Sequence, residues 1–521
     1  MTSIPLISLT TLTPFVLLIC ATILLFLALY TRRAMLARRD RTTLPPGPTG
    51  LPILGLYPFL TRNLILQIDS WAKKYGPLYS LKVGNQLFMI VSDPLIVKDL
   101  MVTNGAIFSS RRDVYLRSRT ILANRGITAS QYGPEWRKHR RLANTVLNTR
   151  SVDQGVHRIE VEANRMIKEL MVLGQGGLCA VNPQPYAGRY SLNNMLEITF
   201  GTHTETINDP FVEKAFWLSK EFMMCSGIMA NLSDFVSILQ HVPNYMYSRC
   251  NALHRELVLT YGGMVKDMER KTQRGEPVPE CLAKTLIQVR EQEGLDDLDI
   301  HMLVSAFLLG GLDSTASIIR CFFALMVVHP DIQRRAQDEL DSVVGRSRLP
   351  VIKDANDLRY VQAIIKEIER CHNPFWLCTP HASNQDFTYR GYFIPKGTAL
   401  VLNTYAMQHD PKRYPEPFRF SPERYLESPG RVDSTYKTIG DKDNWIFGVG
   451  RRICPGIRLA DHEIFLAISR MLWAFKMEEV PQSPIDIEAY SDPSKGNPQE
   501  IYIKMVPRHK KVADIIDGAV V

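Results

Sequence analysis

The sequence predicts one large domain that is built around a long buried helix and preceded by a membrane-spanning helix. Three observations lead to this prediction. An uncharged apolar run covers residues 12–30, a second apolar run covers residues 302–328, and no Gly/Ser-rich linker, internal repeat or low-complexity run follows residue 50. The chain has 521 residues, 45% of them hydrophobic, so it can bury a sizeable core.

The first apolar run, Leu12 to Tyr30, is long enough to cross a bilayer as an α-helix. Five arginines follow it before residue 42, and no charged side chain precedes it. The positive-inside rule therefore places everything after residue 31 in the cytoplasm. A cleaved signal peptide is the alternative, but it would need a basic start, a shorter apolar core and a small-residue cleavage site. We expect residues 1–31 to be a membrane anchor.

Residues 32–50 form a basic, proline-rich linker between this anchor and a domain that covers residues 51–521. It contains Leu44-Pro45-Pro46-Gly47-Pro48, and prolines both stiffen the chain and exclude helix. The orientation also bears on Asn231-Leu232-Ser233, a glycosylation sequon that is used only in a lumenal domain. We expect Asn231 to be unmodified.

Charge and cysteine content narrow the functional class. The chain has 62 Lys and Arg against 53 Asp and Glu, a net charge of +9. Its nine cysteines are odd in number, widely scattered and without CxxC spacing. This pattern argues against a disulfide framework and against a zinc site.

The second apolar run, residues 302–328, predicts a buried helix. Asp313 and Arg320 lie near its middle, and each would cost about 2.5–3.5 kcal/mol inside a membrane, so a second span is disfavoured. Within it, Gly310 and Gly311 each weaken the helix by about 1 kcal/mol. We interpret them as a groove where the backbone meets a ligand, with Asp313, Ser314 and Thr315 able to relay protons. A kink tolerated for helix packing, with Asp313 in a salt bridge, is the alternative.

The stretch Phe447-Gly448-Val449-Gly450-Arg451-Arg452-Ile453-Cys454-Pro455-Gly456 predicts a thiolate ligand of haem iron. Glycines let the main chain fold closely enough to aim N–H groups at sulfur. Arg452 supplies a cation that favours ionisation of Cys454 and can reach a haem propionate. A helix predicted from residue 456 places Cys454 near a helix N-terminus, which also favours an anion. A free cysteine in a glycine-rich turn is the alternative.

This stretch resembles the haem-binding signature of the cytochromes P450, the haem-thiolate monooxygenases. Residues 310–315 resemble the family's oxygen-binding groove, Glu367-Ile368-Glu369-Arg370 its ExxR element, and Trp136 to Arg140 its WxxxR element. The resemblance covers about residues 44–510, with the motifs in the family's order. It implies a mainly α fold with a smaller β part near the N-terminus, and haem b between the central helix and the Cys454 loop.

The resemblance also implies roles for individual residues. Cys454 becomes the axial iron ligand, and Asp313, Ser314 and Thr315 handle protons. Ser314 stands where the family usually has threonine, so which hydroxyl delivers the proton stays open. His381 has a core hydrogen bond as its alternative role. The cofactor-binding residues would be Trp136, Arg140, Gly310, Gly311, His381, Phe447, Arg452, Cys454 and Gly456.

Further residues are implied to shape the site rather than to react. In the family, the counterparts of Glu367, Arg370 and Arg424 form a buried ion network behind the cysteine region. ExxR spacing alone is weak evidence, because Glu162 and Arg165 also have it. The segment around Val114 to Ala123 is implied to lie over the haem. The resemblance also implies an apolar substrate pocket, although core packing is the alternative role for its side chains. The pocket residues would be Phe307, Leu308, Phe375, Trp376 and Leu377.

The implied reaction inserts one atom of O2 into a small lipophilic substrate and reduces the other atom to water. Electrons would come from NADPH through a membrane-bound cytochrome P450 reductase in the endoplasmic reticulum. Arg137, Lys138 and Arg141 would face outward and dock this acidic flavoprotein, rather than form a plain basic surface or a nucleic-acid patch. The sequence resembles fungal enzymes of secondary metabolism, and no nucleic-acid partner is expected.

Two other functions stay open. A haem-thiolate isomerase or dehydratase would share the fold and need no reductase, although the intact acid–alcohol pair at Asp313 and Ser314 argues against it. A non-enzymatic haem sensor or carrier is the second. NADPH-dependent turnover separates the first from a monooxygenase, and oxygen uptake that no substrate changes would favour the second.

Overall fold

The computed structural model describes residues 44–426 except 228 and 230, residues 445–488 and 499–519, and the isolated residue 21. Apart from residue 21, the predicted anchor at residues 12–30 lies outside the described residues. Residues 32–43 of the predicted linker also lie outside them, whereas residues 44–50 are described and contain no helix or strand. The proposed domain from residue 51 onward is the part to which the following description applies.

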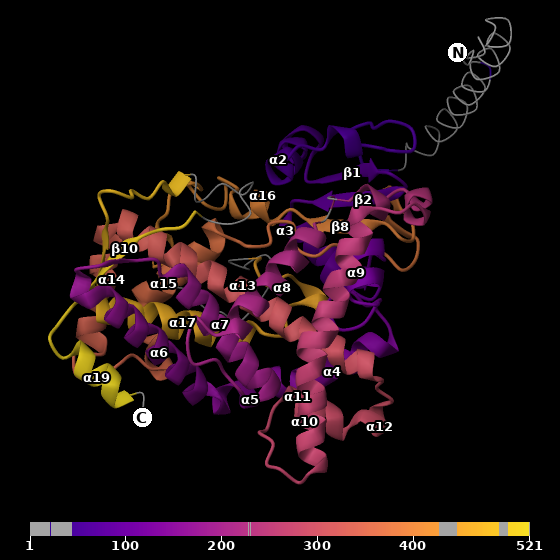
Figure 1. Cartoon of the computed structure of the whole chain (residues 1–521). Coiled ribbons are helices and arrows are strands. Elements are labelled where there is room, and N and C mark those ends of the chain that lie inside the picture. Colours follow the sequence, from indigo (N-terminus) through magenta and orange to yellow (C-terminus); the bar gives the residue numbers. More distant parts are fainter. Residues whose placement is uncertain are drawn as a thin grey trace, which may run out of the picture.

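Most of the described chain is helical, as expected, and the helices pack around α13 (Figure 1). Several begin at a proline in the first turn, where the missing N–H costs nothing. The α-helices are α2 (Leu64–Tyr75), α3 (Pro94–Val97), α4 (Pro134–Leu147), α5 (Thr149–Gln154), α6 (Val156–Gly174), α7 (Gln184–Phe200), α8 (Pro210–Cys225), α9 (Tyr245–Leu257), α10 (Gly263–Gln273), α11 (Leu282–Gln288), α12 (Arg290–Glu293), α13 (Asp297–Val328), α14 (Pro330–Val343), α15 (Arg359–Cys371), α16 (Thr404–Gln408), α17 (Ile457–Ala474) and α19 (Val512–Ala519).

Helix α13 contains the apolar run predicted to be a buried helix. Its start is fixed by a capping box, in which the Asp296 side chain accepts from the Asp299 N–H and Asp299 accepts from the Asp296 N–H. Among the described residues it is the one helix long and apolar enough to cross a membrane, but 72% of its most apolar window is buried. The prediction of a core helix in place of a second span is confirmed.

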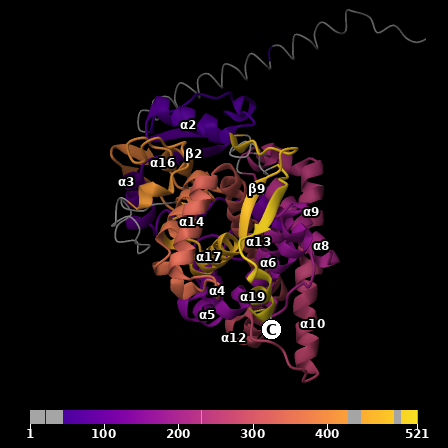
Figure 2. The same cartoon turned by 90° about the vertical axis from the view of Figure 1, so that its left-hand side faces the viewer.

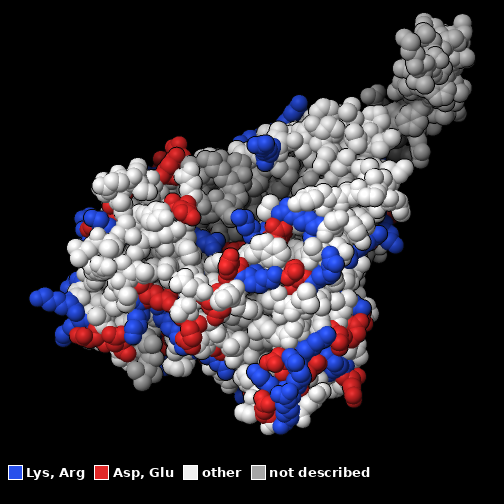
Figure 3. All heavy atoms as spheres, viewed as in Figure 1, with Lys and Arg blue, Asp and Glu red and all other residues white. Residues whose placement is uncertain are grey.

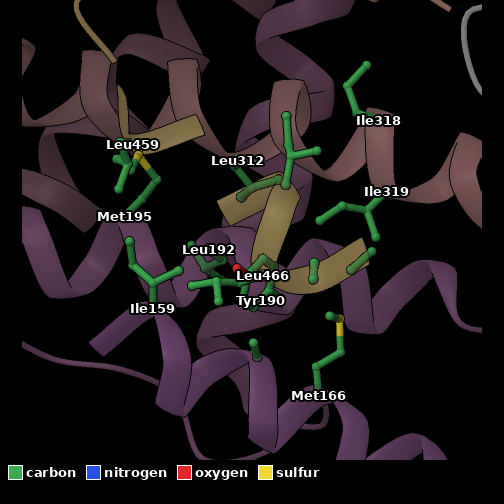
Figure 4. Close-up of a cluster of buried hydrophobic side chains, with 14 of the residues drawn as sticks. Ile159, Met166, Tyr190, Leu192, Met195, Leu312, Ile318, Ile319, Leu459 and Leu466 are labelled. Carbon is green, nitrogen blue, oxygen red and sulfur yellow. The ribbon is translucent and has the colours of Figure 1, made fainter. Parts of the chain in front are cut away.

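The main core lies between α6, α7, α13 and α17. Figure 4 shows side chains from these helices meeting, with Ile159, Tyr190, Leu312 and Leu466 among them. Each of the four is at most 3% exposed. This packing fixes α13 and α17 relative to each other, and the candidate site lies along these two helices.

Three small sheets supplement the helices. The largest has the order β1-β2-β8-β5-β3, with β2 and β8 parallel and the other pairs antiparallel, and its strands β1, β2 and β8 lie beside α2 (Figure 1). The second has the order β4-β10-β9, and Figure 2 shows β9 as a yellow arrow alongside the helices. The strands are β1 (Leu78–Val83), β2 (Gln86–Val91), β3 (Ser110–Arg111), β4 (Ala180–Val181), β5 (His381–Ala382), β6 (Phe387–Tyr389), β7 (Tyr392–Ile394), β8 (Ala399–Leu402), β9 (Phe475–Glu479) and β10 (Ile503–Pro507).

The β part is therefore less confined to the N-terminus than expected. Strands β5 and β8 enter the first sheet from residues 381–402, and most of the second sheet comes from the C-terminal region. Long-range pairing of this kind depends on tertiary packing and has no local sequence pattern.

The structure describes eight of the nine cysteines and the Asn231 sequon. The eight cysteines within the described residues form no disulfide with one another, and these residues contain no group of three or more His, Cys, Asp or Glu side chains able to hold a metal ion. Asn231 is only 7% exposed, and its side chain donates to the Cys225 carbonyl at 3.4 Å. We expect Asn231 to be unmodified on this ground as well, as an endoglycosidase-sensitive mass shift would test.

Candidate active site

A cavity of about 330 Å³ lies between α13 and the loop that carries Cys454. Apolar side chains from several elements complete its walls. The residues singled out by the sequence that line it are Arg140, Phe307, Gly310, Gly311, Ser314, Thr315, Phe375, His381, Phe447, Arg452, Cys454 and Gly456. Segments more than 300 residues apart in the chain thus meet at one place.

The Cys454 loop is a tight turn that ends at a helix. Gly448 and Gly450 have φ of +69° and +62°, and a Cβ on Gly450 would lie 2.3 Å from the Met101 carbonyl oxygen. The Cys454 N–H donates to the Phe447 carbonyl at 2.9 Å, and α17 begins at Ile457. This geometry directs the sulfur into the cavity, close to the N-terminus of α17.

The sulfur is stabilised by a different cation from the one predicted. Burial raises the pKa of the Cys454 thiol, while the Gly456 N–H and the Arg140 guanidinium lower it. Arg140 also donates to the Ile453 carbonyl at 2.6 Å. The cation that lowers the pKa of Cys454 is therefore Arg140 and not Arg452, whose guanidinium donates to backbone carbonyls.

Arg452 and Trp136 form a buried pair on the wall next to the Cys454 loop. Arg452 donates to the carbonyls of Ser109, Ile127 and Ser130 at 2.8, 3.0 and 2.7 Å. Its guanidinium lies 4.3 Å from the centre of the Trp136 ring, and Trp136 donates to the Ile127 carbonyl. Arg452 lines the cavity, whereas Trp136 does not and supports Arg452 from behind.

His381 shares the cavity wall with an arginine that no local sequence pattern marks. Strands β3 and β5 pair so that Arg111 lies opposite His381, and both side chains line the cavity. A hydrogen bond of 2.7 Å joins His381 Nδ1 and the Phe108 carbonyl, while burial and the Arg111 charge lower the pKa of His381 well below its usual range. The core hydrogen bond considered for His381 is present, and it coexists with a position on the cavity wall.

The two glycines of α13 serve different purposes. A Cβ added to Gly310 would meet no atom within 4 Å, so this position is open to the cavity. A Cβ added to Gly311 would lie 1.9 Å from Met195 Sδ, so Gly311 is also needed for packing against α7. Both glycines thus line the cavity, and Gly311 in addition allows close packing of α13 against α7. The Ser314 hydroxyl donates at 2.8 Å to the Gly310 carbonyl, which lies four residues earlier on the same helix.

Asp313 does not reach the cavity. With about 100° of rotation per residue, it lies off the face that carries Phe307, Gly310 and Ser314. The Ser219 hydroxyl donates to its carboxylate, and Arg320 lies 3.8 Å away. The salt bridge that was the alternative for Asp313 is therefore present, and Asp313 is not among the residues that line the cavity.

Glu463 of α17 is a cavity residue that was not predicted. It is 1% exposed, it lines the cavity, and Thr315 Oγ1 donates to its Oε2 at 3.0 Å. Its other oxygen, Oε1, has no hydrogen-bond partner among the described residues. The sequence contains one signal that could have identified Glu463, because this acid directly precedes the apolar residues 464–468. Burial raises the pKa of Glu463 to about 8, an effect that the Thr315 hydrogen bond opposes.

Glu463→Gln is expected to stabilise the protein by about 2–4 kcal/mol at about pH 8.5 and to leave stability nearly unchanged at about pH 5. Between the ordinary value of 4.5 and the raised pKa of about 8, the folded protein holds a proton that the unfolded chain releases. The wild-type free energy of unfolding therefore falls as pH rises through this window. Glutamine does not ionise, so the free energy of unfolding of the variant should lack this decrease. Thermal unfolding at both pH values measures it.

Glu416→Gln, at an exposed acid paired with Arg419, is the control and should show no such pH dependence. An equal effect of Glu463→Gln at both pH values would mean that Glu463 is already ionised in the folded protein at about pH 5, contrary to this account.

Glu367, Arg370 and Arg424 meet in a buried ion network. Arg370 forms a two-point pair with Glu367, with both bonds at 2.8 Å, and Arg424 donates to Glu367 at 3.0 Å. The Glu367 and Arg370 side chains are 0% exposed, and Arg370 also donates to the carbonyls of Gln408 and Pro417. The network joins α15 to the segment 408–424. Glu162 and Arg165 also pair, but within α6.

Two of the five predicted pocket residues line the cavity. Phe307 and Phe375 do, while Leu308, Trp376 and Leu377 do not, which corrects the prediction. Leu308 follows Phe307 on α13 and is rotated into the main core. Trp376 packs edge-on against Tyr405, and Leu377 joins a separate cluster beside the first sheet. The segment around Val114 to Ala123 contributes Arg117 and Leu122 to the wall.

The cations proposed for docking are mostly paired. Lys138 lies 2.7 Å from Glu135, and Arg141 forms a two-point pair with Glu293, at 2.9 and 2.7 Å, while Arg137 is exposed and lies over the Tyr132 ring. On the face shown in Figure 3, acidic and basic residues are interspersed. The net charge of +9 is therefore not gathered into one positive field on this face.

These residues fit a haem. Cys454 provides a sulfur on one wall, Gly310 leaves open space on α13, and arginines that line the cavity can meet two propionates. No rearrangement of the chain is needed to bring these groups to a common cavity.

Comparison with known proteins agrees with this geometry. The family model described as Cytochrome P450 matches residues 45–501. Cytochrome P450 monooxygenase fogE of Aspergillus ruber is 29% identical over 91% of this chain and 91% of its own length. Cytochrome P450 monooxygenase verH of Penicillium polonicum is 31% identical over 88% and 85%, and Cytochrome P450 monooxygenase patI of Penicillium expansum is 30% identical over 92% and 90%. The chain belongs to the cytochrome P450 family and is a haem-dependent monooxygenase.

Proposed function

We propose that this enzyme oxidises a lipophilic secondary metabolite with electrons from NADPH, which reach it through a membrane-bound reductase. Residues 12–30 would anchor it in the endoplasmic reticulum membrane, and residues 51–521 would form its cytoplasmic catalytic domain. The observation that carries this proposal is the cavity, in which Cys454 shares the space with Gly310, Ser314 and an apolar wall. The similarity to fungal P450 monooxygenases supports the reaction type of this proposal.

Different residues of the cavity would bind the iron, the propionates and the substrate. Cys454 would hold the iron as a thiolate, and Arg140, Arg452, Arg111 and His381 would bind the propionates. Haem with a thiolate ligand supplies O2 activation and favours O–O cleavage. Gly310 leaves room for the reacting molecule, and Phe307 and Phe375 hold an apolar substrate and exclude water.

Proton delivery falls to Ser314 in this proposal. The Thr315 hydroxyl is engaged by Glu463, whereas Ser314 bonds only the Gly310 carbonyl on the open groove. Ser314 Oγ can therefore turn to the cavity and return, passing a proton without breaking the buried Thr315–Glu463 hydrogen bond. Asp313 would act behind it, through its contacts with Ser219 and Arg320.

Reconstitution tests this function. Full-length enzyme in membranes with a fungal P450 reductase should consume O2 and oxidise candidate metabolites only when NADPH is present. Omission of the reductase is the control. Conversion of a peroxide or endoperoxide without NADPH would instead favour the isomerase or dehydratase, and unchanged O2 uptake across all substrates would favour a sensor or carrier.

A further inference from the structure

Arg117 is a cation that the cavity contains but the proposed haem site does not use. It lies in the π-helical turn η4 (Tyr115–Ile121) and lines the cavity. Its Nε is buried without a hydrogen-bond partner, and no carboxylate within the described residues forms an ion pair with its guanidinium. The Arg117 side chain as a whole is half-buried, and a buried N–H group without an acceptor is costly, which points to an anion that enters the cavity from outside the chain.

The other arginines of the cavity are held by the protein. Arg111 donates to the Thr379 carbonyl at 2.5 Å, and Arg140 to the Ile453 carbonyl. Arg452 donates to three carbonyls. Arg117 is thus the one arginine among the described lining residues that makes no side-chain hydrogen bond.

The nearest acid to Arg117 is already engaged. The Asp234 carboxylate accepts a hydrogen bond from the Leu116 N–H at 2.9 Å, and it interacts electrostatically with both Arg112 and Arg117. Burial lowers the pKa of Arg117, and Asp234 offsets this only in part. Asp234 therefore helps to keep Arg117 charged without covering its N–H groups.

Arg117 borders the groups assigned to the propionates on one side only. Its charge lowers the pKa of Arg111, which is assigned to the propionates, and that of Arg112, which is not. It is not among the charges that shift the pKa of His381 or of Cys454. The cavity wall beyond η4 is apolar, with Leu122, Phe222 and Met223. A cation on an apolar wall suits a ligand that joins a hydrophobic body to one negative group.

We propose that Arg117 binds a carboxylate of the substrate, so that the natural substrates of this enzyme are lipophilic acids rather than neutral molecules. This inference rests on the proposed function, because it assumes that the cavity receives the substrate. Two N–H groups of one guanidinium can bind both oxygens of a carboxylate, which fixes the orientation of the substrate as well as its affinity.

A matched pair of probes tests this proposal. Binding of 2-naphthoate and of 2-naphthamide to the full-length holoenzyme is measured by titration calorimetry. The two probes have nearly the same shape, but only the acid is ionised near neutral pH. The wild type should bind the acid about 10- to 100-fold more tightly than the amide, the range expected for a hydrogen bond to a charged group.

Variants on the same turn separate the possible outcomes. Arg117→Gln should abolish the preference for the acid, while Arg119→Gln, at an exposed arginine paired with Asp113, should keep it. Equal affinity of the wild type for both probes, or no binding of the acid, would overturn the proposal. Loss of haem from Arg117→Gln with the acid preference intact would assign Arg117 to the propionates and overturn it too. Failure of the wild type to bind haem would count against the proposed function instead.

Discussion

Arg370→Ala is expected to lose haem and soluble protein together. The substitution leaves Glu367 buried at 0% exposure with Arg424 as its remaining cationic partner, and it frees the carbonyls of Gln408 and Pro417. Breaking a buried ion network costs about 3–5 kcal/mol, which is a large part of the free energy of unfolding of a typical domain, roughly 5–15 kcal/mol. Soluble yield, haem per protein and thermal unfolding measure the effect.

Arg165→Ala provides the matched control, because Arg165 has the same spacing to Glu162 but is 24% exposed and belongs to α6. It should retain haem and lose far less stability. Arg370→Lys should fall between the two, because lysine keeps the charge but cannot form the two-point pair. Full haem content with only reduced turnover in Arg370→Ala would contradict a purely structural role.

Cys454→Ser is expected to lower monooxygenase turnover by more than about 100-fold, because a serine oxygen does not donate electron density to iron as a thiolate does. The backbone of the loop should be unaffected, since the Cys454 N–H bond to Phe447 does not involve the side chain. The absorbance of the reduced carbon monoxide complex and the rate of NADPH-dependent product formation measure the change.

Cys378→Ser is the control for Cys454→Ser. Cys378 is half-buried and lines the same cavity, so it reports any general effect of replacing a cavity sulfur. It should keep the red-shifted Soret band and most of the turnover. A Cys454→Ser enzyme that retains both would mean that sulfur is supplied by another residue.

The sequence predicts the parts of the site that local spacing determines. The Cys454 turn, the start of the following helix, the long core helix and the Glu367–Arg370 pair all depend on residues within a few turns of each other, and periodicity or glycine spacing marks them. The relation between these parts came from the family resemblance, because spacing alone does not place residue 454 beside residue 310.

The remaining features depend on tertiary packing. Arg111 meets His381 only because the two-residue strands β3 and β5 pair across the sheet. Glu463 meets Thr315 because α13 and α17 cross at that point. The orientations of Asp313 and Leu308 depend on the rotation of α13, which its packing against α7 and α17 sets and which a nearly uniformly apolar helix does not reveal.

The central claim, sulfur from Cys454 bound to haem iron, is tested most directly by the carbon monoxide spectrum of the reduced wild-type enzyme. The account predicts a strongly red-shifted Soret band in the full-length protein, absent from Cys454→Ser and present in Cys378→Ser. Protein that binds no haem, or a band at the position of nitrogen-ligated haem in the wild type, would contradict it.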